Sequence, residues 1–198
     1  MIIADTKRDK SIYGQLTSIA PTISLTNLGA GYGDTLTDDL VIGEAVNKCK
    51  QMEDVISAHL KRMSDLAAAA PKVHLSVLYA DTEPPDFATH GANQWELEIL
   101  ATIGLKSVVP AKPGSRSQKI SLEQLFSYNP EVMFLGASGE PSIVDTQWKS
   151  SPVWKQLSAV QNNRVFTVDD GLWSVERGIK TSEKVLQQAV DSLKGSGN

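Results

Sequence analysis

The sequence is poor in features that mark several protein classes. Its 198 residues include one cysteine, Cys49, so an internal disulfide is excluded, and no Cys/His cluster indicates a structural zinc site. No apolar run approaches the ~20 residues needed to span a bilayer. Lys and Arg number 19 against 23 Asp and Glu, which gives a net charge of −4. A broad surface for nucleic-acid phosphates is therefore not expected.

The N-terminus lacks the features of a secretory leader. The segment 1–5 has no basic start, no long apolar run and no small-residue cleavage site. It is typical instead of the second half of a buried strand. We therefore expect further sequence upstream in the parent protein, whether the shortening is natural or engineered.

The hydrophobic pattern alternates between strands and helices, without internal repeats. Strands are expected over 2–4, 22–25, 74–79, 107–109, 132–135 and 164–168, and helices over 12–19, 35–70, 94–103, 121–128, 151–158 and 179–193. The segment 35–70 predicts a long helix that would link two lobes, with Gly43 as a point of interruption. A helix of about 30 residues would be about 45 Å long. Strands alternating with helices favour an α/β fold with a covered parallel sheet.

Two glycine-rich segments resemble enzyme motifs, but each lacks a required residue. A dinucleotide-binding fingerprint from Gly29 would need glycine at position 34, where Asp34 stands, so a flexible connector is the better interpretation. A nucleophile elbow at Ser138 would need glycine in place of Glu140. All three histidines also precede Ser138, contrary to the chain order of α/β hydrolases. A hydrolase-like enzyme stays open as the alternative function.

The histidines and the cysteine do not follow a metal-ligand spacing. His59 is expected at the surface or boundary of the long helix, and His74 packed or at a strand edge. His90 falls in a loop that would approach a ligand. Cys49 lies on the apolar stripe and is expected in the core. Metal catalysis is therefore not expected.

Two predicted loops concentrate positive charge. Their cations are Lys7, Arg8 and Lys10 in the first loop, and Lys106, Lys112, Arg116 and Lys119 around the second. Both loops follow strands, and ligands of open α/β sheets bind at strand carboxyl ends. Arginine there would suit carboxylates through paired hydrogen bonds, and a solvated surface is the alternative.

The four tryptophans differ in their expected roles. Trp148 and Trp154 have apolar neighbours and are expected to pack in the core. Trp95 begins a helix, and Trp173 precedes Arg177 by four residues. An exposed Trp173/Arg177 pair would form a platform for a ligand, and a packing contact at a helix start is the alternative.

Several segments together resemble the periplasmic iron(III)-siderophore substrate-binding proteins of ABC importers, especially the ferric-dicitrate type. The matching segments, in order along the chain, are 2–9, 12–16, 19–22, 122–125, 129–132, 154–165 and 172–178. The resemblance implies a two-lobe periplasmic-binding-protein fold with a long inter-lobe helix and an incomplete first lobe. The implied parts are a first-lobe remnant (1–34), the inter-lobe helix (35–70), the C-terminal α/β lobe (71–170) and a helix returning to the first lobe (171–198).

The same resemblance implies a ligand site in the cleft between the lobes. Its implied contact residues are Arg8, Phe87, Trp95, Arg116, Trp173 and Arg177. The family often has histidine where Asp9 stands, so that contact differs. The implied function is binding without chemistry or a cofactor: the siderophore or citrate holds the iron, arginines neutralise an anionic chelate, and tryptophan faces pack on it.

The resemblance also implies partners and a location. Carboxylates such as Glu44, Glu53 and Glu140 would dock on arginines of the membrane permease. The parent of a shortened chain would be periplasmic or lipid-anchored, whereas a native chain of this length would stay in the cytoplasm. A further alternative is a non-binding module that exchanges elements with a second copy to form a homodimer.

Overall fold

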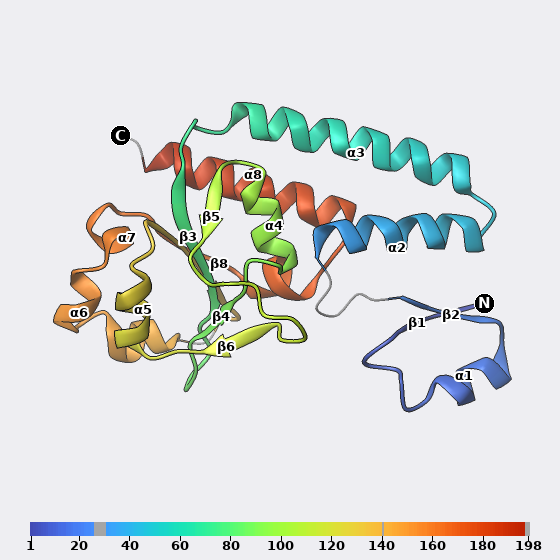
Figure 1. The fold of residues 1–198 in the computed structure, drawn as a ribbon, viewed down its shortest axis with the longest axis horizontal. Helices are drawn as coiled ribbons and strands as arrows, with labels where there is room; N and C mark the ends of the chain where they lie inside the picture. The colour runs from blue at the N-terminus through green and yellow to red at the C-terminus, as the bar shows by residue number, and fades with distance from the viewer. Residues whose placement is uncertain (26–30, 140, 197–198) are drawn as a thin grey trace.

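The larger part of the molecule is built on a six-stranded sheet with helices on both faces (Figure 1). The computed structural model describes residues 1–25, 31–139 and 141–196. The sheet strands are β3 (Leu75–Asp81), β4 (Ala88–His90), β5 (Leu105–Ser107), β6 (Ser117–Lys119), β7 (Val132–Ala137) and β8 (Val165–Asp169). Their order is β6-β4-β3-β7-β8, with β5 paired to the start of β3. The predicted α/β class is confirmed.

The strands of the sheet are mostly parallel. β3 runs parallel to β5 and β7, and β7 runs parallel to β8. β4 is antiparallel to both β3 and β6. β4 and β6 lie in segments that the sequence pattern assigned to loops, because strands of three residues show too little alternation to stand out. The strand expected at 107–109 lies two residues earlier in the structure.

Alternation along the central strands divides the core into two halves. In β3, Val77 and Tyr79 pack into the half on one face of the sheet, and Leu78 and Ala80 into the half on the other. Successive side chains of a strand point to opposite faces, and here both faces are covered. The four residues are fully buried, which explains the continuous apolar run in the sequence.

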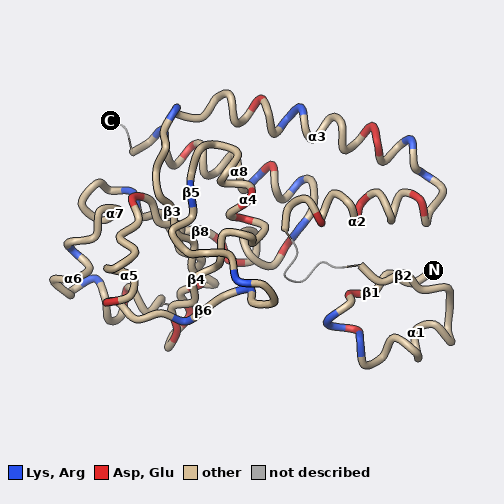
Figure 2. The backbone as a smooth tube through the Cα atoms, viewed as in Figure 1, with Lys and Arg blue, Asp and Glu red and all other residues tan. Residues whose placement is uncertain are grey.

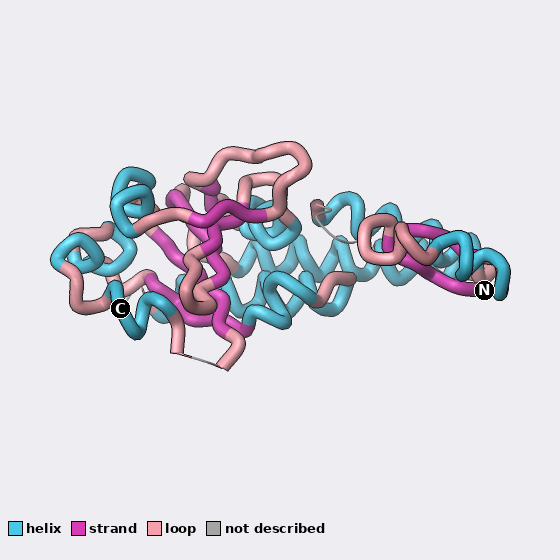
Figure 3. The backbone as a smooth tube through the Cα atoms, turned by 90° about the horizontal axis from the view of Figure 1, so that it is seen from below, coloured by secondary structure: helices cyan, strands magenta, loops and turns pink. Residues whose placement is uncertain are grey.

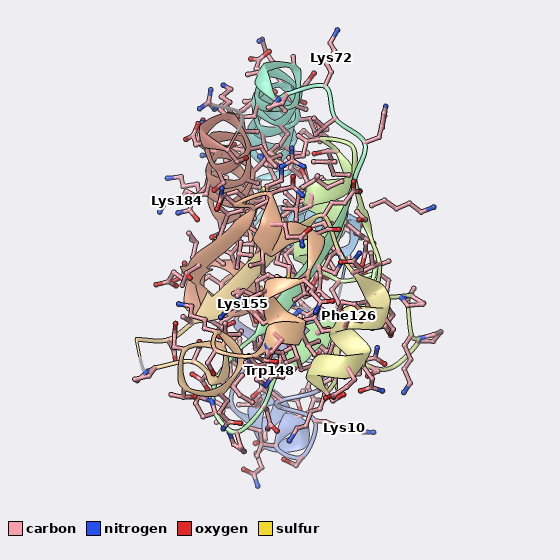
Figure 4. The ribbon with its side chains drawn as sticks, turned by 90° about the vertical axis from the view of Figure 1, so that its left-hand side faces the viewer. Lys10, Lys72, Phe126, Trp148, Lys155 and Lys184 are labelled. Atoms are coloured by element: carbon pink, nitrogen blue, oxygen red, sulfur yellow. The ribbon has the colours of Figure 1, made fainter. Side chains whose placement is uncertain are left out.

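Helices form a layer on each side of the sheet. The elements, in chain order, are α3 (Cys49–Ala69), α4 (Trp95–Ala101), α5 (Leu122–Tyr128), the π-helical turn η1 (Val144–Trp148), α6 (Pro152–Lys155), α7 (Ser158–Gln161), the π-helical turn η2 (Gly171–Val175) and α8 (Ile179–Gly195). α3, α4 and α8 supply one half of the core, and α5, η1 and α6 the other. The end-on view shows α3 and α8 side by side in its upper part, with the labelled Phe126 and Trp148 in its lower part (Figure 4).

The predicted helix over 35–70 is wrong, because two helices occupy this region. α2 (Tyr32–Ala45) and α3 are separated by a short turn in which Asn47 has a φ of 55°. The amide of Lys48 donates to the carbonyl of Gly43, and the chain reverses. Gly43 is buried, and a Cβ there would lie 2.6 Å from Cβ of Met52. Glycine therefore lets the two helices approach closely, and α3 alone is about 31 Å long.

A small N-terminal unit lies apart from the large sheet. β1 (Ile2–Asp5) and β2 (Thr22–Leu25) are parallel and are joined by α1 (Tyr13–Ile19). The view from below shows an elongated molecule with this unit at one end and the large sheet toward the other (Figure 3). Ile3 and Ile19 are exposed by 49% and 75%, so much apolar surface of this unit is uncovered.

Local capping signals in the sequence are confirmed. Ser121 caps α5 and forms a capping box with Gln124, and Ser151 caps α6 with Pro152 at its first position. The helix expected over 151–158 is wrong in its length, since it divides into α6 and α7. Within the described part of the chain, no helix is long and apolar enough to cross a membrane.

Candidate ligand-binding site

A cavity of about 520 Å³ lies where the N-terminal unit meets α2 and the segment before α8. Arg8 from the loop after β1 and Arg177 from the segment between η2 and α8 both line it. Ile3, Leu25 and Ile42 contribute apolar lining. The sequence therefore brings two of its predicted site residues together from segments more than 160 positions apart.

Hydrogen bonds to carboxylates shape the loop that carries Arg8. Asp5 Oδ1 accepts the amides of Lys7 at 2.7 Å and Arg8 at 2.8 Å. Asp9 Oδ2 in turn accepts the amide of Asp5 at 2.7 Å. This turn presents Arg8 as an exposed side chain on the cavity. Asp9, which stands where the family often has histidine, thus orders the loop.

Arg177 lies beside other charged residues of the predicted site. Burial lowers the pKa of its guanidinium, and the positive charges of Arg116 and Arg8 lower it further, while Glu96 opposes the shift. Its guanidinium carbon lies 5.9 Å from the ring centroid of Trp95, a cation–π contact. Figure 2 shows cationic segments in the loop after β1 and the loop before β6 on sides that face each other.

Arg116 is held by hydrogen bonds to η2. Its Nη2 donates to the carbonyl oxygen of Ser174 at 2.8 Å and to the Ser174 hydroxyl. Arg116 is half-buried and follows the turn before β6. The basic loop thus places one arginine, Arg116, near Arg177, and its lysines Lys106, Lys112 and Lys119 are exposed.

Negative charge is also present at the cavity. Asp38 and Asp39 from α2 line it together with Asp5 and Asp9. Burial and the neighbouring Asp38 raise the pKa of Asp39. The cavity therefore has a cationic side, with Arg8 and Arg177, and an acidic side on α2. An anion bound here would need to face the arginines.

His90 lies behind the site as a fully buried ion-pair partner. Its Nδ1 is 2.5 Å from Glu96 Oε1, and its Nε2 is 3.0 Å from Asp81 Oδ2. Burial alone would lower the pKa of His90, but the hydrogen bonds and charges of the two carboxylates outweigh it and raise the pKa to about 9. The expectation that His90 approaches a ligand from a loop is wrong: it lies in β4 with no exposed surface.

The carboxylate network continues from Asp81 to the end of β8. Asp81 and Asp170 share a hydrogen bond, and Tyr79 Oη donates to Asp170 Oδ1 at 2.9 Å. Burial and the adjacent Asp81 raise the pKa of Asp170. A Cβ on Gly136 would lie 2.4 Å from Tyr79 Oη, so only glycine leaves room for this bond.

Sequence reasoning missed Asp81, Glu96, Asp170 and Ser174, which surround the predicted arginines. Asp81 and Asp170 directly follow or end apolar strands, and this position at the strand carboxyl ends was the available signal. Glu96 sits on a helix turn where an acid is unremarkable. Nothing in the local pattern indicates that its side chain is fully buried.

Three of the predicted contact residues, Phe87, Trp95 and Trp173, lie in the core. Phe87 is 2% exposed and stacks on Trp148 with ring centroids 4.6 Å apart, on the other face of the sheet. Trp173 has no exposed surface and stacks on Phe134 at 4.7 Å. The exposed Trp173/Arg177 platform is therefore wrong, and the packing alternative holds. The ring beneath Arg177 belongs to Trp95.

Other residues singled out in the sequence have mixed outcomes. His59 is 2% exposed, between Tyr32 and Glu183, so its predicted surface placement is wrong. Cys49 starts α3 and is exposed, contrary to the core prediction. Trp148 and Trp154 are buried in the core as predicted. The connector over 29–33 lies partly outside the described residues; Gly31 is the N-cap of α2, and residues 32–33 are already helical, contrary to the prediction.

The surroundings of Ser138 lack the histidine that a serine nucleophile of the α/β-hydrolase type requires, within the described ranges. Ser138 is exposed and its hydroxyl donates to Glu83, a carboxylate, with no histidine among its hydrogen-bond partners in the described ranges. Over these same ranges, no group of three or more His, Cys, Asp or Glu side chains is arranged to hold a metal ion. A further cavity of about 330 Å³ next to η1 contains none of the predicted site residues.

The ion pairs of His90 predict a loss of stability at alkaline pH. The pKa of about 9 in the folded state exceeds the ordinary value of 6.5, so His90 stabilises fully below pH 6.5 and loses this effect as pH rises through 9. We expect the free energy of unfolding to fall by on the order of 3 kcal/mol between pH 6 and 9.5. Urea denaturation across this range measures it, with His90→Gln showing a flatter profile. Parallel profiles for the two proteins would contradict this role of His90.

Comparison with known proteins identifies the family to which this fold belongs. Residues 1–172 match the family described as periplasmic binding protein, and the chain belongs to that family. It is similar to the Fe(3+)-citrate-binding protein YfmC of Bacillus subtilis, with 38% identity over 188 residues that cover 92% of this chain and 58% of YfmC. It is 33% identical over 190 residues to the Fe(3+) dicitrate-binding periplasmic protein FecB of Escherichia coli, covering 96% of this chain and 62% of FecB.

Solved structures show the same fold. The crystal structure of Staphylococcus aureus SirA superposes with a TM-score of 0.79 at 22% identity, covering 98% of this chain and 76% of SirA. Among the curated relatives, the chain spans 58% of the length of YfmC and 62% of the length of FecB. These comparisons establish the family and the fold.

Proposed function

We propose that this chain is a solute-binding component of an ABC importer and that it captures an iron(III) chelate, either ferric citrate or a siderophore, in the arginine-lined cavity. The chelator holds the iron in this proposal, and the chain carries out no chemical step and requires no cofactor. Arg8, Arg177 and Arg116 contribute the positive charge, and Trp95 supports Arg177 from below.

The meeting of three arginines from distant segments carries this proposal. Arg8 and Arg177 line one cavity, and the charges of Arg8 and Arg116 both act on Arg177. Like charges repel, so this grouping costs free energy, which the carboxylates on the same cavity and a bound anion would offset. The relatives named for Fe(3+)-citrate and Fe(3+) dicitrate support a carboxylate-rich ferric chelate as that anion.

The same proposal assigns the parts of the chain and its setting. Residues 1–34 belong to a first lobe, 35–70 link the lobes, 71–170 form the C-terminal lobe, and 171–198 return toward the first. The membrane permease is the partner, with Glu44 and Glu53 exposed on α2 and α3, whereas Glu140 lies outside the described residues. The location in this proposal is periplasmic or lipid-anchored, as the names of the relatives suggest. Exchange of elements with a second copy stays a prediction for light scattering to test.

A fluorescence titration tests the proposal. We expect ferric citrate to quench tryptophan emission saturably, because the buried ring of Trp95 lies 5.9 Å from the guanidinium of Arg177, and Arg177 lines the cavity. Iron-free citrate and a neutral ferric hydroxamate serve as the comparison ligands. Trp95→Phe is expected to lose most of the quenching, and Trp154→Phe, on the other face of the sheet, to retain it.

The outcomes of this titration separate the alternatives. Saturable quenching by one ferric chelate alone supports binding and identifies the ligand class. No saturable response to any chelate, by fluorescence and by calorimetry, would contradict the proposed function. Equal quenching in Trp95→Phe would move the ligand away from Arg177.

A further inference from the structure

The π-helical turn η2 ends close to the basic loop and leaves a buried carbonyl group there. Its closing hydrogen bond runs from the amide of Glu176 to the carbonyl oxygen of Gly171 at 2.8 Å. Glu176 has extended backbone, so the helical ladder stops at this residue. The last carbonyls of a helix lack amide partners and need another donor where they are buried. Ser174 is 2% exposed, so its carbonyl oxygen has this need.

Arg116 from the basic loop supplies that donor. Its Nη2 donates to the Ser174 carbonyl oxygen at 2.8 Å and to the Ser174 hydroxyl. One guanidinium nitrogen carries two hydrogens, so a single residue can accept both. Two acceptors fix the plane of a guanidinium as well as its position, and the rigid fork of arginine loses little freedom in forming such a pair.

The Ser174 hydroxyl is oriented by a carboxylate that follows β8. Burial raises the pKa of Asp170, and hydrogen bonds from the hydroxyls of Tyr79 and Ser174 oppose the shift. The bond from Tyr79 Oη to Asp170 Oδ1 is 2.9 Å long. A hydroxyl that donates to a carboxylate keeps its lone pairs for another donor. The hydroxyl of Ser174 can therefore accept from Arg116 at the same time.

The two hydrogen bonds between Arg116 and Ser174, here called the Arg116–Ser174 clamp, lie directly before the part of the chain that carries Arg177. Ser174 precedes Arg177 by three residues, and Arg177 and Gly178 line the cavity. Arg116 is not among the described residues that line it. The hydrogen bonds of Arg116 therefore act on η2, whereas Arg177 lies on the cavity itself.

We propose that Arg116 is a positioning residue: the Arg116–Ser174 clamp fixes the end of η2 and so places Arg177 on the cavity. For its effect on ligand affinity, this inference rests on the proposed function. Its structural part, a fixed end of η2, does not depend on any ligand. Preorganisation of this kind increases affinity because less ordering remains for the moment of binding.

The simpler alternative is that Arg116 contributes only its positive charge. Ser174→Ala separates the two roles, because it removes one acceptor of the clamp and leaves every charge in place. A role by charge alone predicts unchanged ligand affinity in this variant. A positioning role predicts that the affinity falls, and that Ser174→Ala has no further effect once Arg116→Met has removed the clamp.

The matched control is Ser182→Ala in the first turn of α8. Ser182 is also buried, and its hydroxyl donates to the carbonyl oxygens of Ile179 at 2.8 Å and Gly178 at 3.1 Å. Both Ser174→Ala and Ser182→Ala remove one buried serine hydroxyl and no charge. A general effect of losing a buried hydroxyl would therefore appear in both variants.

The experiment combines hydrogen exchange without ligand and affinity with ligand. By NMR, we expect the amide of Glu176 to exchange about fivefold faster in Ser174→Ala and in Arg116→Met. Ser182→Ala should leave this exchange unchanged, and the amide of Leu186 in α8 is the reference for global unfolding. Calorimetry should show an affinity for ferric citrate about fivefold weaker in Ser174→Ala, and within about twofold of the unaltered protein in Ser182→Ala. In the Arg116→Met background, adding Ser174→Ala should change the affinity by less than about twofold.

Each result bears on the inference. Unchanged exchange of Glu176 in Ser174→Ala, unchanged affinity in that variant, an equal affinity loss in Ser182→Ala, or an additive loss in the double variant would overturn it. If Ser174→Ala fails to fold, Ser174→Cys decides in its place, because it keeps the shape of the side chain and accepts hydrogen bonds only weakly. If the unaltered protein binds no chelate, the proposed function fails, and the exchange of Glu176 alone decides whether the clamp fixes η2.

Discussion

Arg177→Met is expected to weaken the binding of ferric citrate by about 100-fold, since removing one partner of a desolvated charge pair costs roughly 2–5 kcal/mol. Arg177 is half-buried, lines the cavity and lies over Trp95. Methionine keeps the length and apolar packing of the side chain while removing the charge. Calorimetric titration of both proteins at one salt concentration measures the change.

A matched arginine outside the cavity controls for net charge. Arg164 precedes the start of β8, whereas Arg177 follows its end. The two residues therefore lie at opposite ends of the strand. Arg164 is half-buried, and its charge acts on Glu131. Arg164→Met is expected to leave the affinity within about twofold, because charges far from the cavity are screened by salt. Equal losses in the two variants, or no loss in Arg177→Met, would contradict a specific role for Arg177.

The second large effect concerns stability. Trp173→Ala is expected to lower the free energy of unfolding by about 3–5 kcal/mol, the range for deleting a large buried aromatic side chain. Trp173 is fully buried, stacks on Phe134 at 4.7 Å and on Tyr79 at 6.0 Å, and donates its Nε1–H to Gln188 Oε1 at 2.7 Å. Urea unfolding followed by circular dichroism measures the loss.

Two further variants separate packing from ligand contact at Trp173. Val175→Ala in the same π-helical turn should change the stability by less than about 0.5 kcal/mol, because Val175 is 51% exposed. Trp173→Phe should retain ligand affinity while losing part of the stability. A Trp173→Phe protein with full stability and lost affinity would restore the sequence-based assignment of Trp173 to the ligand site.

The arginines of the candidate site were within reach of sequence reasoning, and their supporting residues were not. Arg8 and Arg177 stand in segments whose pattern resembles the family, so both could be named by position. The roles of Glu96 and Asp81 could not be read from the sequence, because they arise from contacts between elements that are distant in the chain. Such contacts join residues far apart in the chain, as with Asp81 and Asp170, and leave no local pattern.

The same limit explains the errors on Trp173 and on the long helix. A tryptophan close to an arginine in the chain indicates a platform only if both face solvent, and the packing of η2 on β7 buries Trp173 instead. The apolar periodicity from 35 to 70 continues through the turn because α2 and α3 pack against each other, so the reversal at Asn47 leaves the pattern unbroken.

The amino-acid sequence by itself determined the α/β class, the two-sided burial of the central strands, the caps of α5 and α6, and the family. These features follow from period-two and period-3.6 patterns and from short-range hydrogen bonds, which neighbouring residues encode directly. Only the tertiary structure decided that Trp95 rather than Trp173 lies beneath Arg177, and that His90 joins two carboxylates. Burial and charge pairing at those places arise from elements that meet only when the chain is folded.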